Sequence, residues 1–140
     1  MKSFLNLALA FVLGATFGSV ANMMVITYGP TVVPQPEGAD FTTPEAAAAS
    51  MELLEPHHFV VPFVAHALGT LLGAFLAAKI AKTRRLGVAL SIGAFFLLGG
   101  VMAAVMIGSP MWFNVVDLVF AYLPMAWLGA RAAGATQAAE

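Results

Sequence analysis

The chain has 140 residues, of which 61% are hydrophobic and 9% are charged, and its formal net charge is −1. This composition excludes an ordinary soluble domain and is typical of a protein that lies in a bilayer. The absence of cysteine excludes disulfides, iron–sulfur clusters, thiolate zinc sites and cysteine nucleophiles, and the few basic residues form no stripe that would bind nucleic acid.

Four apolar segments are long enough to cross a membrane as helices, since a crossing takes about 20 mostly apolar residues. They are Phe4–Tyr28, Phe59–Ile80, Leu86–Ile107 and Met111–Ala130. None alternates like a strand, and the chain is too short for a membrane barrel of about eight strands or more. We therefore predict an all-α membrane protein, a four-transmembrane-helix bundle that forms a single transmembrane domain over residues 1–140.

The first apolar segment also fits a secretory signal peptide. Lys2 precedes an apolar run that leads to the small residues Ser19-Val20-Ala21, and this order is typical of a cleaved leader. However, apolar residues continue past that site from Met23 to Ile26. We therefore expect the segment to be retained as a membrane-spanning helix.

The connection between the first two segments is long and falls into two parts. The first part, GPTVVPQPEGAD, is rich in proline and glycine, which predicts irregular structure. The second part, TTPEAAAASMELLEP, offers a threonine cap, a proline in the first turn and a closing proline. We predict a short helix over Pro44–Leu54 at the outer surface.

Charged residues are segregated along the chain. All six basic residues fall at the N-terminus, between the second and third segments, or after the fourth: Lys2, Lys79, Lys82, Arg84, Arg85 and Arg131. The positive-inside rule predicts that these parts, and both termini, are cytoplasmic. Five of the 7 acidic residues lie in the first connection, at Glu37, Asp40, Glu45, Glu52 and Glu55. We predict that residues 29–56 lie outside.

Small residues recur at intervals of four, at Gly14 and Gly18 on the first helix and at Gly69 and Gly73 on the second, and Gly100 lies on the third. In lipid, such residues let helix backbones approach closely. The spacing does not distinguish packing within one chain from packing between chains. We predict a tightly packed bundle that forms a homo-oligomer or attaches to a larger membrane complex.

Polar residues interrupt the apolar segments at one depth. With a rise of about 1.5 Å per residue, His66 lies about 10 Å from the outer end of its helix, and Asn22 and Asp117 lie about 9 Å from theirs. Asn114 is one turn away from Asp117 on the same side of the fourth helix. We predict a polar layer inside the bundle, in which Asp117 holds His66 and Asn22 shares a hydrogen bond with the pair.

This layer has a structural and a functional interpretation. An unpaired carboxylate at mid-membrane costs roughly 2.5–3.5 kcal/mol even on lenient scales, so Asp117 should be paired. A pair that only fixes the register of the helices would meet this need. Intramembrane ionisable residues also mark ion pathways and proton relays, and the functional interpretation is a proton or ion site that opens to the outside.

The sequence predicts no cofactor, although two metal chemistries fit some of its residues. His57 and His58 lie at the outer water interface, where they and nearby methionines such as Met106 offer soft ligands to copper(I). Haem would need His66 and a second axial histidine or methionine, and the chain has no haem attachment motif. Solvated histidines and core methionines explain the same residues without a metal.

Three stretches carry a resemblance that covers nearly the whole chain: GSVANM in the first segment, AHALGTLLGA in the second, and SPMWFNVVDL with AYLPMAWLG in the fourth. On these stretches the chain resembles small uncharacterised bacterial inner-membrane proteins with four transmembrane helices. The resemblance implies a location in the bacterial plasma membrane, and it implies no particular activity.

Three classes of function fit these observations. The first is a small subunit or scaffold that self-associates or packs on a larger membrane complex, for which tight helices and an outer loop suffice. The alternative is a small ion, proton or solute transporter or channel that uses Asn22, His66 and Asp117. An intramembrane enzyme fits least, since there is no metal-ligand quartet, phosphate loop or pair of carboxylates at reactive spacing. We therefore predict no catalytic residues.

Overall fold

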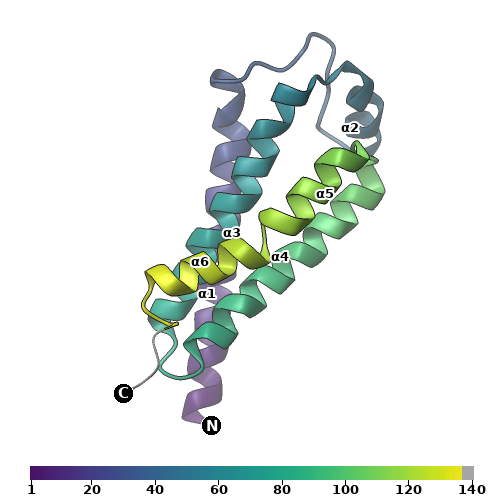
Figure 1. Cartoon of the computed structure of the whole chain (residues 1–140). Coiled ribbons are helices and arrows are strands. Elements are labelled where there is room, and N and C mark those ends of the chain that lie inside the picture. The colour runs from purple at the N-terminus through teal and green to yellow at the C-terminus, as the bar shows by residue number, and fades with distance from the viewer. Residues whose placement is uncertain (137–140) are drawn as a thin grey trace.

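A computed structural model describes residues 1–136, most of which are helical and none of which forms a strand. The helices that cross the molecule are α1 (Lys2–Tyr28), α3 (Val60–Ile80), α4 (Arg85–Ile107), α5 (Met111–Phe120) and α6 (Leu123–Ala132) (Figure 1). Four helical stretches are long and apolar enough to span a membrane, the last of them made by α5 and α6 together. The predicted all-α class is confirmed, and by length and composition the chain is a multi-pass membrane protein.

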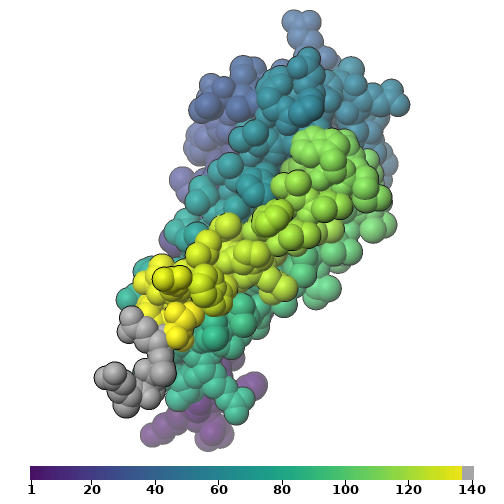
Figure 2. Space-filling model, in the orientation of Figure 1, coloured from purple at the N-terminus to yellow at the C-terminus, as the bar shows by residue number. Residues whose placement is uncertain are grey.

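Helix α3 is central, because it packs against α1, α4 and α6, whereas α1 and α4 touch one another much less. The molecule is elongated, with the N-terminus near one end and the connection between α1 and α3 at the other (Figure 2). We call the end formed by residues 29–59 the loop end. The opposite end, called the basic end, contains the N-terminus, the turn between α3 and α4 and the end of α6. All 6 Lys and Arg residues lie there.

Helices α1 and α3 cross closely where their glycines face one another. A Cβ atom built on Gly14 would lie 2.7 Å from the carbonyl oxygen of Gly73, and one built on Gly18 would lie 2.5 Å from that of Gly69. A real Cβ atom does not approach a backbone oxygen so closely, so the crossing requires glycine. The small-residue rows of α1 and α3 are therefore used within one chain.

The fourth segment differs from the single helix predicted over Met111–Ala130. Ala121 and Tyr122 form a turn that separates α5 from α6. Pro124 contributes to the break, because proline has no N–H to donate to the carbonyl of Phe120 and its ring would clash with that carbonyl in a continuous helix.

The connection at the loop end contains the short helix α2 (Pro44–Ser50), followed by a 3-10 turn over Met51–Leu53. The hydroxyl of Thr43 accepts a hydrogen bond from the backbone N–H of Ala46 and caps the helix. The α-helical part is therefore about one turn shorter than the predicted Pro44–Leu54. Helix α2 packs on α4, so the connection folds back over the end of the molecule.

Hydrogen bonds within the connection join residues near Asp40 to one another and to Ser50. The buried hydroxyl of Ser50 accepts a hydrogen bond from the N–H of Asp40 at 2.8 Å and donates one to its carbonyl oxygen at 3.1 Å. Hydrogen bonding by Thr42, through its side chain and its backbone, holds the pKa of the Asp40 carboxyl below its usual range. This carboxylate therefore keeps its negative charge into acidic pH.

At the basic end, Arg85 joins three helices. It begins α4, and its guanidinium donates to the carbonyl of Ala78 in α3 at 2.8 Å and to those of Ala133 and Gly134 after α6 at 2.6 and 3.2 Å. Asn6 of α1 donates to the last carbonyl of α3 at 3.2 Å. The last carbonyls of a helix have no partner within it, so these side chains cap α3 and α6.

Candidate functional site

His66, Asp117 and Tyr122 form a hydrogen-bonded group among the helices. Nδ1 of His66 lies 2.9 Å from Oδ1 and 3.0 Å from Oδ2 of Asp117, and the hydroxyl of Tyr122 donates to Oδ2 at 2.9 Å. The Tyr122 ring also stacks on the imidazole, with 5.7 Å between the ring centroids. Asp117 and Tyr122 are buried, whereas 25% of the His66 side chain is exposed. The carboxylate therefore has two donors, and the imidazole is open on one side.

The break between α5 and α6 places Tyr122 in this group. In an uninterrupted helix, a residue five positions after Asp117 would point about 140° away around the axis, at about 100° per residue. The turn at Ala121 and Tyr122 brings the phenol back to the carboxylate. Gly100 of α4 makes room for it, because a Cβ atom there would collide with the Tyr122 hydroxyl and ring.

A cavity of about 260 Å³ reaches from the loop end to His66 and Asp117, and we call it the loop-end cavity. Its walls come from the connection, the last turn of α1, and helices α3, α4 and α5, and most of the side chains that line it are apolar. Phe41 of the connection, Phe59 before α3 and Phe113 of α5 supply aromatic surface. The connection therefore covers a space that α3 and α5, which touch one another little, leave between them.

A second cavity of about 290 Å³ lies between α1, α3 and α4, with the exposed residues Met23 and Gly99 at its edge, and we call it the side cavity. Asn22, Thr70 and Tyr122 contribute to its lining. The hydroxyl of Thr70 is buried and has no hydrogen-bond partner within residues 1–136. His66 and Ala103 line both cavities, so the imidazole lies at the boundary between them.

The residues predicted to form the polar layer have different surroundings. His66 and Asp117 are in direct contact. Asn22 lines the side cavity together with His66, but among the described residues no hydrogen bond joins the two. Asn114 lines the loop-end cavity, and its Nδ2 donates to the backbone carbonyl of Ser109 at 2.9 Å. The layer is therefore a tight pair with two polar neighbours rather than one connected network.

The residues considered for copper are at the loop end. His57 and His58 lie in the 3-10 turn before α3, and Nδ1 of His58 accepts a hydrogen bond from the backbone N–H of Glu55 at 2.9 Å. This bond gives His58 a capping role and occupies one of its two ligand atoms. Met106 is exposed on α4. In the part of the chain that the structure describes, no three His, Asp or Glu side chains are grouped so that they could hold a metal ion.

Tyr122 is the member of the site that was not predicted. Its sequence signal is a tyrosine within an apolar segment, two residues before Pro124 and five after Asp117. A tyrosine buried in such a segment needs a partner for its hydroxyl, but the helical spacing does not point to Asp117 unless the helix breaks.

No protein family, curated protein or solved structure matches the chain.

Proposed function

We propose that the chain is a small membrane transporter or channel component that binds its solute at the His66–Asp117 pair. The observation that carries this proposal is the position of the pair, which lines the loop-end cavity instead of being enclosed by packed side chains. Sites for small molecules are concave and mostly apolar, with a few convergent polar groups, and this cavity has the same character. Ionisable residues within membrane-spanning segments are costly and often mark a pathway.

A role as a subunit or scaffold, in a homo-oligomer or a larger complex, stays a prediction. The sequence features that favour it are the tightly packing helices and the outer loop, and the glycines of the small-residue rows, Gly14, Gly18, Gly69 and Gly73, have close partners within the chain. A purely structural role also offers no explanation for a covered cavity that ends at an ionisable pair. The geometry therefore supports solute binding and transport better than assembly alone.

If water reaches the cavity, cysteines placed at two neighbouring positions of α4 should react with a water-soluble reagent at different rates. Ala103 lines both cavities, whereas Met102 does not and is 63% exposed on the surface that we assign to lipid. In this cysteine-free chain, Ala103→Cys should react with a water-soluble methanethiosulfonate at least about tenfold faster than Met102→Cys, because only the thiolate reacts and a thiol in hydrocarbon does not ionise. Rates in reconstituted vesicles can be followed by mass spectrometry.

The two variants control for one another. Their depths in the membrane differ by only about 1.5 Å, so depth cannot account for a difference in rate. Ala89→Cys, at a fully buried position of α4, serves as an unreactive reference. Equal rates at positions 102 and 103 would contradict the proposal, because the cavity would then be closed to water.

We further propose a bacterial plasma-membrane location, with both termini in the cytoplasm and residues 29–56, including α2, outside. The segregation of basic residues at the basic end supports this orientation. Ala39→Cys should react with a membrane-impermeant thiol reagent in intact cells, and Arg84→Cys should react only after the cells are opened. Labelling of Arg84→Cys alone from outside would reverse the orientation.

A further inference from the structure

The chemistry of the loop-end cavity indicates the kind of solute that it accepts. We propose that it binds a small apolar amine in its protonated form, with the ammonium group beside Asp117 and the apolar body among the phenylalanine side chains. This inference rests on the proposed function, because it requires that a solute enters the cavity.

The size and the walls of the cavity fit a molecule with one ring. An apolar cavity of about 150 Å³ can hold benzene, so a volume of about 260 Å³ leaves room for a ring with a short substituent. Phe41, Phe59 and Phe113 line the space, and the rings of Phe59 and Phe113 are 4.8 Å apart at their centroids. Aromatic walls provide apolar contact, and their faces also attract a cation.

The polar groups near the pair present hydrogen-bond acceptors. Nδ2 of Asn114 donates one of its two N–H groups to the carbonyl of Ser109, and Oδ1 of the same side chain is an acceptor. When the neutral imidazole of His66 donates from Nδ1 to Asp117, its other nitrogen is an acceptor as well. The carboxylate of Asp117 is the third acceptor. An ammonium group, which carries only donors, complements this set.

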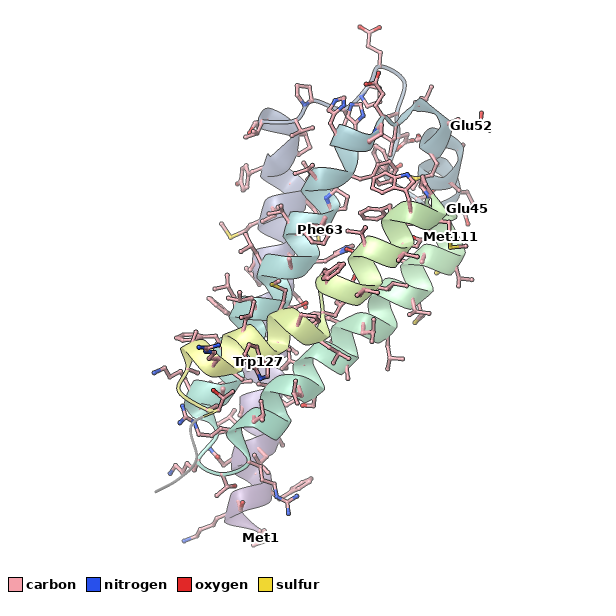
Figure 3. The ribbon with its side chains drawn as sticks, in the orientation of Figure 1. Met1, Glu45, Glu52, Phe63, Met111 and Trp127 are labelled. Carbon is pink, nitrogen blue, oxygen red and sulfur yellow. The ribbon has the colours of Figure 1, made fainter. Side chains whose placement is uncertain are left out.

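The distribution of charge also favours a cation. None of the 6 Lys and Arg residues lines the cavity, because all of them lie at the basic end. The loop end carries the exposed carboxylates of Glu37, Asp40, Glu45, Glu52 and Glu55. Glu45 and Glu52 lie at the opposite end of the molecule from Met1 (Figure 3). Charge of one sign around a cleft with apolar walls raises the local concentration of ions of the other sign.

The test uses the whole protein in phosphatidylcholine nanodiscs and three probes of similar size and different charge. They are 2-phenylethylammonium, the uncharged 2-phenylethanol and the anion phenylacetate. Isothermal titration calorimetry, with empty nanodiscs as the reference, gives each affinity. We expect 2-phenylethylammonium to bind at least about tenfold tighter than 2-phenylethanol, and phenylacetate to show no measurable binding.

Two variants identify the charge that is responsible for the preference for the ammonium probe. Asp117→Asn keeps the shape of the side chain and removes its charge, so the preference for the ammonium probe should disappear while 2-phenylethanol binds as before. Glu45→Gln removes the same charge from the exposed surface, where water and salt screen it, and should lower the affinity for the ammonium probe only slightly. Circular dichroism checks that both variants fold. If Asp117→Asn does not fold, the comparison of the three probes on the native chain still decides.

Equal affinities for the ammonium and the alcohol, or tighter binding of phenylacetate, would overturn this inference and leave the proposed function standing. Failure to bind any of the three probes would also overturn it. The proposed function itself is judged separately, by the reaction rates of cysteines at positions 102 and 103.

Discussion

Gly18→Leu and Gly73→Leu should each prevent α1 and α3 from packing, with a loss of about 3 kcal/mol or more of the free energy of unfolding. Even a Cβ atom on Gly18 would lie 2.5 Å from the carbonyl oxygen of Gly69, and one on Gly73 would lie 2.7 Å from that of Gly14. A leucine side chain therefore forces the two helices apart. Unfolding in mixed micelles, followed by circular dichroism, measures the loss.

Gly99→Leu is the matched control for these variants. A Cβ atom on Gly99 of α4 would meet no atom within 4 Å, so we expect a change of less than about 0.5 kcal/mol. Light scattering of the purified protein separates packing within the chain from packing between chains. If Gly18→Leu reduced the number of chains per particle without changing the unfolding curve, the glycines would serve self-association instead.

Asp117→Ala should lower the free energy of unfolding by about 2–4 kcal/mol, because it leaves Nδ1 of His66 and the hydroxyl of Tyr122 without an acceptor, and each orphaned donor costs about 1–3 kcal/mol. His66→Ala should cost less, since Tyr122 still donates to the carboxylate. The double variant should lose less than the sum of the two, with a coupling of about 0.6–1.7 kcal/mol, as measured for hydrogen bonds between membrane helices.

The same unfolding assay measures all three variants. Tyr122→Phe is a useful reference, because it removes one donor and leaves the aromatic ring in place beside His66. Strictly additive losses for His66→Ala and Asp117→Ala would mean that the two side chains do not act on one another in the folded protein, which contradicts the pairing seen in the structure.

The long helices and the contact between His66 and Asp117 could be predicted because they depend on simple quantities. Length and hydropathy determine which segments can cross a bilayer, and the rise per residue places His66 and Asp117 at equal depth. The cost of a lone carboxylate in lipid then requires a partner at that depth. Asn22 meets the same criterion of depth but forms no hydrogen bond with His66 in the described chain, because depth says nothing about which way a side chain faces.

The break before α6 and the role of Tyr122 could not be predicted from segment length, hydropathy or the rise per residue. Proline occurs in membrane helices that continue through it with a kink, because neighbouring groups can satisfy the freed carbonyl. Pro124 alone therefore does not distinguish a kink from a turn. The contact between Tyr122 and Asp117 exists only because the helix stops at Ala121, and the room for it depends on Gly100 of a different helix.

The cavities depend on how the helices and the connection are arranged in space, which the sequence pattern does not determine. The loop-end cavity exists because α5 lies away from α3 and because the connection folds back over the gap. Neither the angle between two helices nor the path of a proline-rich segment follows from hydrophobic periodicity. The acidic character of that segment was visible in the sequence, whereas its position over a cavity was not.

The two ends of the molecule differ in the kind of contact that joins their helices, and Arg85 accounts for the contacts at the basic end. Its guanidinium ties the start of α4 to α3 and to the end of α6. At the loop end, α5 and α3 touch little, and the ring of Phe59, just before α3, packs on the ring of Phe113 of α5 with 4.8 Å between the centroids. The helices are therefore joined by directional hydrogen bonds near Arg85 and by aromatic packing at the loop end.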